Sequence, residues 1–208
     1  MEFRKVLPGE EAEFSDYARP LWLDANESLV GGGRPMIEEI CEDWIGPETV
    51  RRKIGEGFVF GYLMEDGRKA GFASFGIQGD GVIELDKLYL EPEFRGKGYG
   101  KSALEHVLEH GRSLGCSKAV LIVNSNNAPA VSLYERFGFV TEEVKAYRRN
   151  GWPETRLYIM SKRIVRRPPE PLVGLYIQYT NQSCIGYNTL RLFFVHIARM
   201  YFILDSVI

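Results

Sequence analysis

Apolar positions along the first quarter of the chain recur at helical spacing after one short alternating segment. Residues 2–6 alternate and predict a strand, which a proline–glycine turn ends. Apolar side chains then return every three to four residues, which predicts amphipathic helices over 10–22 and 35–44 and a further turn or two over 47–54. A run of consecutive glycines before the second helix predicts a break between the first two.

The pattern changes at residue 57 to short runs of aromatic and β-branched residues. Residues 57–65, 69–78 and 82–90 predict three strands, because Asp-Gly and Gly-Asp-Gly turns separate them. Turns this short join neighbouring strands, so we expect an antiparallel meander.

The remaining elements alternate between helix and strand. A glycine-rich segment opens a long helix with an apolar stripe, and Gly115 is a natural stop for it. A buried strand over 118–123 follows, and Asn127 is a good N-cap for the next helix. The last two strands are expected at 139–144 and 155–161.

This order of elements predicts an α/β (α+β) fold, with a mixed central sheet of about seven strands flanked by helices. A single domain over residues 1–165 holds all of them, and residues 166–208 form a C-terminal extension whose structure the pattern does not define. Residues 190–208 are apolar on nearly every face. Two arginines, a histidine and an aspartate in this stretch argue against a membrane anchor.

Composition narrows the function classes. The chain has 208 residues, 45% of them hydrophobic, which suffices for one well-buried domain and an appendage. A net charge of −2 argues against a broad basic face for nucleic acid. Cys41, Cys116 and Cys184 have no zinc-site spacing, and so sparse a set fits a reducing cytoplasm. The start lacks the apolar core of a signal peptide, so we expect a cytoplasmic protein.

The stretch from residue 88 to 102 carries the most chemistry. A strand runs into a glycine-rich turn, and that turn opens a helix. A helix start offers unpaired backbone N–H groups and the positive end of a dipole, and glycines let an anion approach closely. Arg95, Lys97 and Lys101 add positive charge. The turn therefore predicts a phosphate or pyrophosphate site rather than an ordinary turn with solvated cations.

Two other phosphate-binding motifs fit less well. A Walker A loop shares the ending Gly100-Lys101-Ser102, but its first glycine would fall at Arg95. The strand that follows ends in Asn124 rather than in an aspartate that could hold Mg²⁺. A dinucleotide-binding unit needs its glycines after the first strand of a parallel βαβ unit, whereas an antiparallel meander precedes them here.

Two motifs together resemble the GNAT acetyltransferase superfamily. Residues 95–100, Arg-Gly-Lys-Gly-Tyr-Gly, are similar to the R/Q-x-x-G-x-G/A signature, and residues 126–139 are similar to its N-x-x-A-x-x-x-Y-x-x-x-G-F segment. The element order resembles the family over about residues 2–163. The resemblance implies an N-acetyltransferase that uses acetyl-CoA, needs no metal and acts on a primary amine. A non-catalytic acyl-CoA-binding or interaction module on the same fold is the alternative.

The resemblance also assigns roles to residues. It implies that a strand end offers backbone groups to the pantetheine amides, with the N–H of Tyr89 or Leu90 facing the oxyanion, and that the glycine turn holds the pyrophosphate. Tyr134 matches a tyrosine whose hydroxyl lies near the CoA sulfur, although its helical face also predicts a core position. The implied cofactor-binding residues are Leu88, Tyr89, Leu90, Arg95, Gly96, Lys97, Gly98, Tyr99, Gly100, Lys101 and Asn127.

A catalytic base is expected on the strand before the signature. Glu84 has the spacing that some family members use for a base, which acts directly or through water; the alternative is an edge carboxylate that faces solvent. Asp86 shares its strand face, and two adjacent carboxylates would raise the pKa of one of them. A second base position of the family falls on Ile122, which cannot serve. His106 and His110 lack a third metal ligand, so we expect solvated side chains.

The resemblance implies that the first helices and the final hairpin wall the acceptor side. Trp22 and Trp44 lie in this first wall, and an acidic wall would attract a cationic acceptor such as a polyamine, a lysine-like amine or a peptide amine. Solvated helix faces are the alternative, and Arg148 and Arg149 would instead suit a carboxylate. The sequence is also compatible with a homodimer. Against one arginine, Arg34, the acidic residues of the wall are Asp24, Glu27, Glu38, Glu39, Glu42, Asp43 and Glu48.

Overall fold

The computed structural model describes residues 1–30, 33–79, 81–148 and 154–165. The chain divides into two units, Met1–Arg166 and Arg167–Ile208. The second unit, with Cys184 and the apolar end of the chain, lies outside the described residues. Among the described helices, none is both long enough and apolar enough to cross a membrane.

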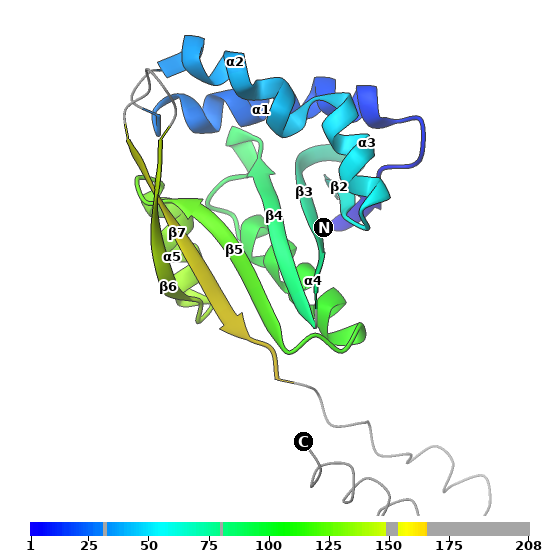
Figure 1. The fold of residues 1–208 in the computed structure, drawn as a ribbon. Helices are drawn as coiled ribbons and strands as arrows, with labels where there is room; N and C mark the ends of the chain where they lie inside the picture. Colours follow the sequence, from blue (N-terminus) through cyan, green and yellow to red (C-terminus); the bar gives the residue numbers. More distant parts are fainter. Residues whose placement is uncertain (31–32, 80, 149–153, 166–208) are drawn as a thin grey trace, which may run out of the picture. The chain divides into compact units, whose positions relative to one another are not determined.

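One mixed sheet organises the described part of the chain. Its seven strands lie in the order β1-β2-β3-β4-β5-β7-β6 (Figure 1). Neighbouring strands are antiparallel except for β4 and β5, which run parallel. This arrangement confirms the expected fold class. The strands are β1 (Glu2–Lys5), β2 (Val59–Glu65), β3 (Arg68–Gln78), β4 (Val82–Leu90), β5 (Lys118–Asn124), β6 (Val140–Tyr147) and β7 (Thr155–Arg163).

Helices cover the two faces of this sheet in two groups. Helices α1, α2 and α3 share one buried cluster with β2 and β3, and α4 and α5 share another with β3, β4, β5 and β7. Figure 1 shows the first group across the ends of β3 and β4, and α4 behind the sheet. The helices are α1 (Glu11–Glu27), α2 (Gly33–Ile45), α3 (Pro47–Gly55), α4 (Tyr99–Ser113) and α5 (Ala128–Arg136), with a 3₁₀ turn, η1 (Pro92–Phe94), before α4.

Helix α1 runs past its expected end at residue 22 to Glu27, although Pro20 lies inside it. An interior proline removes one backbone hydrogen bond and costs about 3 kcal/mol. Leu21, Trp22 and Leu23 around it are all buried against the sheet and α2. Because fully burying one such side chain contributes about 1.5–3 kcal/mol, packing outweighs the proline.

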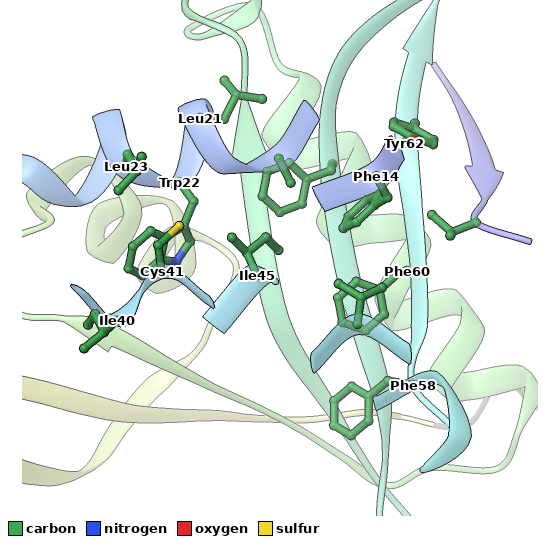
Figure 2. Packing of buried hydrophobic residues seen from close by; sticks show 14 of the residues in the cluster. Phe14, Leu21, Trp22, Leu23, Ile40, Cys41, Ile45, Phe58, Phe60 and Tyr62 are labelled. Carbon is green, nitrogen blue, oxygen red and sulfur yellow. The ribbon is translucent and has the colours of Figure 1, made fainter. Parts of the chain in front are cut away.

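The core beneath α1 is built from aromatic rings (Figure 2). Phe14 of α1 meets Phe60, Tyr62 and Phe72 edge-on, with ring centroids 5.6, 5.4 and 5.4 Å away. Edge-to-face pairs of this kind add to the burial energy. They fix α1 on β2 and β3, and so fix the wall that α1 forms beside β4.

Helix α4 packs closely on the other face of β4. Its expected apolar stripe is buried there, with Leu104, Val107 and Leu108 against Ile83 of β4, but it ends before Leu114, which is 57% exposed. A Cβ added at Gly111 would lie only 2.8 Å from Ile83 Cγ2. This close approach sets the height of α4, and therefore of the glycine turn at its start, above the sheet.

Candidate active site

Strands β4 and β5 separate halfway along their length. Their parallel pairing runs only from Val82↔Lys118 to Leu85↔Leu121. Beyond these pairs β4 stays bound to β3 and β5 stays bound to β7, each to its last residue. In the described part of the chain, the facing edges of the two strands have no strand partner there (Figure 1). This opening lies beside the backbone to which the family resemblance assigns the pantetheine amides.

The separation begins at a bulge in β4. Strand β3 pairs Phe75 with Leu85 and Ser74 with Lys87, so Asp86 is an extra residue. The bulge turns Asp86 and Lys87 toward the same face, where they meet α3 and α2 respectively. Strand residues on either side of it keep their apolar side chains toward α4.

Asp86 accepts hydrogen bonds from three side chains at this bulge. Its carboxylate lies 2.7 Å from Lys53 Nζ, 2.9 Å from Lys87 Nζ and 2.8 Å from Ser74 Oγ. The side chains of Asp86 and Lys87 are only 8% and 3% exposed. We call these four residues the Asp86 network.

The electrostatics of the Asp86 network correct one expectation. Burial raises the pKa of Asp86, but the ammonium groups of Lys87 and Lys53 lower it by more than burial raises it, so the net pKa is lowered. The idea that Glu84 and Asp86 would raise a carboxyl pKa is therefore wrong for Asp86, which is ion-paired. Burial lowers the pKa of Lys87, and the carboxylates of Asp86 and Glu84 partly offset this.

Glu84 lies two residues before Asp86 on a central strand. It pairs with Gly76 on one side and Val120 on the other, so it is not on a sheet edge. Its side chain is half-buried and accepts a hydrogen bond from Gln78 Nε2.

The glycine turn before α4 has the geometry of an anion site. Gly96 and Gly98 have φ values of +73° and +89°, in the left-handed region that favours glycine. The N–H groups of Tyr99, Gly100 and Lys101 lie in the first turn and have no acceptor within the helix, and no side chain caps them. A Cβ built at either left-handed glycine meets nothing within 4 Å, so the space beside the turn is open.

Three exposed cations surround this turn. Arg95 Nε donates to the carbonyl oxygen of Leu90 at 2.9 Å, which ties the turn to the end of β4. Lys97 is exposed, and Lys101 Nζ lies 3.8 Å from Glu105 on the helix surface. Their exposure leaves them able to approach an anion at the helix start.

Helix α5 brings two expected residues beside the opening. Asn127 caps the helix as predicted, because its Oδ1 accepts from Ala130 N at 3.2 Å. Tyr134 is 8% exposed and packs against Phe139, with ring centroids 6.0 Å apart. Burial, and then the nearby Tyr89, raise the pKa of the Tyr134 hydroxyl. A phenol of this kind stays protonated at neutral pH and can donate a hydrogen bond.

Tyr89 joins the end of β4 to α1. Its ring stacks on Phe72, with centroids 5.0 Å apart, and its hydroxyl accepts from Asn26 Nδ2 at 3.3 Å. Burial raises the pKa of Tyr89 to about 12. The carbonyl of Leu29 accepts from Asn124 Nδ2 at 3.2 Å, which ties the end of α1 to the end of β5.

The acidic wall of α1–α3 is partly neutralised. Arg34 pairs with Asp24 and Glu27, at 2.7 and 3.2 Å. Arginines just outside the wall pair with two more of its acids: Arg19 with Glu42 and Arg51 with Glu48. The wall keeps a net negative charge, because its seven acids outnumber these three arginines.

The two tryptophans of this wall differ. Trp22 is 5% exposed and belongs to the core, whereas Trp44 is 42% exposed. They stack with ring centroids 6.4 Å apart, and Lys87 Nζ lies 5.7 Å from the Trp44 ring. Of the hairpin arginines, Arg148 is paired with Glu154 at 2.6 Å, and Arg149 lies outside the described residues.

The two histidines of α4 contact aromatic rings. His106 is exposed and stacks on Phe3, with centroids 4.9 Å apart, and His110 meets Phe75 edge-on at 5.1 Å. Within the residues that the structure describes, no cluster of His, Cys, Asp and Glu could hold a metal ion.

The sequence does not predict the Asp86 network, but it carries a signal for the bulge on which the network is built. Ile83 and Leu85 alternate, and Leu88 and Leu90 alternate out of phase with them. A change of phase within one strand predicts a bulge between the two pairs. The contacts of Asn26 and Lys53 had no comparable signal, because both come from distant helices.

Comparisons with known proteins point to one family. The model of the acetyltransferase (GNAT) family matches residues 14–139. The chain is similar to the spermine/spermidine N(1)-acetyltransferase of Bacillus subtilis (33% identity, 37% of this chain and 56% of that one). It is also similar to the [ribosomal protein bS18]-alanine N-acetyltransferase of Escherichia coli (31% identity, 52% of this chain and 70% of that one).

Among solved structures, the fold resembles the PaiA N-acetyltransferase of Thermoplasma acidophilum in complex with coenzyme A. The TM-score is 0.62 at 23% identity, over 78% of this chain and 98% of that one. The chain spans about half the length of the first curated relatives that it matches. From the family match over most of the sheet and both motifs, the chain belongs to the GNAT acetyltransferase family.

Proposed function

We propose that the protein transfers the acetyl group of acetyl-CoA to a primary amine. The observation that carries this proposal is the coincidence of two features at one end of the sheet. The open glycine turn at the start of α4 suits a pyrophosphate, and the separation of β4 from β5 exposes strand edges that suit an amide-bearing arm. The printed activities of the B. subtilis and E. coli relatives support it.

In this proposal CoA lies along the end of β4 and over the start of α4. The N–H groups of Tyr99, Gly100 and Lys101 hold the pyrophosphate, with Gly96 and Gly98 allowing close approach. Arg95, Lys97 and Lys101 supply charge. The backbone of Leu88, Tyr89 and Leu90 pairs with the pantetheine amides, and Asn127 uses the amide nitrogen that its cap leaves unused.

The chemistry requires a neutral amine, a stabilised oxyanion and a leaving thiolate. The amine nitrogen bonds to the acetyl carbon, the carbon–sulfur bond breaks, and the proton that the amine loses passes by way of Glu84 or water to the leaving thiolate. The N–H of Tyr89 or Leu90 faces the oxyanion. Tyr134 donates a hydrogen bond to the sulfur but keeps its proton. Its pKa is raised above the ordinary value for tyrosine and so lies above the thiol pKa of about 8.5.

Glu84 takes the proton of the amine, directly or through water. Asp86 is a poor candidate for this step, because its lowered pKa and three donors keep its charge engaged. Glu84 has one donor, Gln78, and its side chain is half-buried on the same face of β4.

For the acceptor we propose a cationic amine: a polyamine, a lysine-like amine or a peptide amino group. The net negative wall of α1–α3 and the exposed Trp44 support this class. The pairing of four wall acids with arginines makes electrostatic attraction weaker than the sequence alone predicts. Buried thiols at Cys41 and Cys116 fit a reducing compartment, so we assign the enzyme to the cytoplasm.

A thiol-release assay with acetyl-CoA tests this proposal. The acceptors are spermidine, lysine, an alanine-starting peptide, a neutral amine and glutamate, each at two salt concentrations. The cationic acceptors and the peptide should lead, with an advantage that shrinks as salt rises. If CoA binds and no amine releases thiol, the chain is a non-catalytic CoA-binding module. If glutamate leads, the cationic acceptor class is wrong.

A further inference from the structure

The Asp86 network is a set of buried charges that none of the proposed reaction steps uses. Two ammonium groups share one carboxylate, and all three charged side chains are 20% exposed or less. Desolvating such charges is costly, and well-packed apolar residues of similar volume often stabilise a fold equally well. Stability alone therefore gives no reason for this arrangement.

The position of the network gives a reason. Its members come from three elements: Lys53 from α3, Ser74 from β3, and Asp86 and Lys87 from β4. They converge at Asp86, the extra residue of the bulge in β4, which directly follows Leu85, where the pairing of β4 with β5 ends. The carboxylate can keep all three donors only while the extra residue stays in that place.

The bulge sets the direction of everything that follows on β4. Side chains and backbone groups alternate along a strand with period two, so loss of one extra residue turns every later residue to the other face. Leu88, Tyr89 and Leu90 follow the Asp86 network on β4, so they would turn with it. In the turned orientation Tyr89 would lose its stacking on Phe72 and the hydrogen bond that its hydroxyl accepts from Asn26.

We propose that the Asp86 network is a positioning device that holds the bulge and so aims the backbone of Leu88, Tyr89 and Leu90 at the pantetheine arm of CoA. Asp86, Lys53 and Lys87 are positioning residues in this role, since they act through the strand. The inference rests on the proposed function, because this aim matters only where CoA binds along β4.

Calorimetry with two ligands on the full chain tests the role. CoA carries the pantetheine arm, and 3′-phospho-ADP carries the pyrophosphate without that arm. Asp86→Glu keeps the charge but moves the carboxylate by one methylene. Lys53→Met is a milder second variant, because it leaves the pair of Asp86 and Lys87. The matched control is Glu142→Gln, which breaks an exposed carboxylate–lysine–serine contact between β5, β6 and β7.

Asp86→Glu should weaken CoA binding by about tenfold, roughly the cost of one amide hydrogen bond. It should leave the affinity for 3′-phospho-ADP within about twofold, since the start of α4, and not β4, holds the pyrophosphate in this proposal. Lys53→Met should act in the same direction by a smaller factor, and Glu142→Gln should change neither affinity. A merely structural role would weaken both ligands together, or neither, and either result overturns the inference. If the unaltered protein binds no CoA, it is the proposed function that fails.

Discussion

Two carboxylates, one on the central strand β4 and one on the edge strand β6, have nearly the same partners and different surroundings. Asp86 accepts from Lys53 Nζ at 2.7 Å and Ser74 Oγ at 2.8 Å. Glu142 accepts from a lysine and a serine as well, Lys118 Nζ at 2.8 Å and Ser161 Oγ at 2.6 Å. The Asp86 side chain is 8% exposed, whereas that of Glu142 is 45% exposed.

The difference between them shows that distance alone does not give an interaction its energy. Water screens Glu142 and replaces its partners when they leave, so such pairs contribute little. Water has little access to Asp86, which is 8% exposed, and a lost partner there leaves a largely buried charge without its counterion. Buried polar groups of this protein should therefore be sensitive to substitution, and exposed ones with the same geometry should not.

The largest effect is expected from Asp86→Asn. The variant leaves Lys87, 3% exposed, beside an uncharged amide, and removing one partner of a buried ion pair costs about 3–5 kcal/mol. Urea unfolding should show that loss, while Glu142→Gln keeps the midpoint of the unaltered protein. The double variant Asp86→Asn with Lys87→Met should recover part of the loss, because it removes the most deeply buried unpaired ammonium and leaves only that of Lys53, which is 20% exposed. Equal midpoints for Asp86→Asn and Glu142→Gln would remove the contrast between the two regions.

The next largest effect is expected from Tyr134→Phe, which removes a buried neutral hydroxyl. The ring keeps its packing on Phe139, so folding should change little, but a hydroxyl that bonds the leaving sulfur is lost. We expect kcat to fall roughly 10- to 100-fold with acetyl-CoA affinity nearly unchanged, since the lost contact forms in the transition state. Tyr158→Phe on β7 is the control for losing a tyrosine hydroxyl. Unchanged turnover in Tyr134→Phe would make Tyr134 a packing residue only.

Elements that depend on local sequence could be predicted, and those that depend on distant contacts could not. The turn at Gly98 and the cap at Asn127 follow from the residues within one helical turn, and the structure has both. The continuation of α1 through Pro20 depends on packing against the sheet and α2. The contact between Asp86 and Lys53 joins residues 33 positions apart, so no local pattern contained it.

The same contrast between buried and open surroundings extends to two glycines. A Cβ at Gly71 of β3 would lie 2.1 Å from the carbonyl oxygen of Tyr89, while one at Gly55, the last residue of α3, would meet nothing within 4 Å. Gly71→Ala should cost about 1–3 kcal/mol of stability, as overpacking does, and should weaken CoA binding by moving the end of β4. Gly55→Ala should be neutral or slightly stabilising. Thermal unfolding and calorimetry on both variants measure this difference, and equal results would place the strain elsewhere.

The smallest effect is expected from Glu84→Gln, because Glu84 lies between the two extremes. It is half-buried, with one donor, Gln78, on a strand that the rest of the sheet holds in place. The amide keeps that shape but cannot take a proton from the amine. The rate should fall roughly tenfold near pH 6.5, where the acceptor arrives protonated, and the deficit should shrink toward pH 9, where neutral amine is more abundant. Gln78→Leu removes the donor and keeps the carboxylate, so its pH profile should follow the unaltered protein. A ratio between Glu84→Gln and the unaltered protein that stays flat across this range would mean that Glu84 does not act as the base and that water alone accepts the proton.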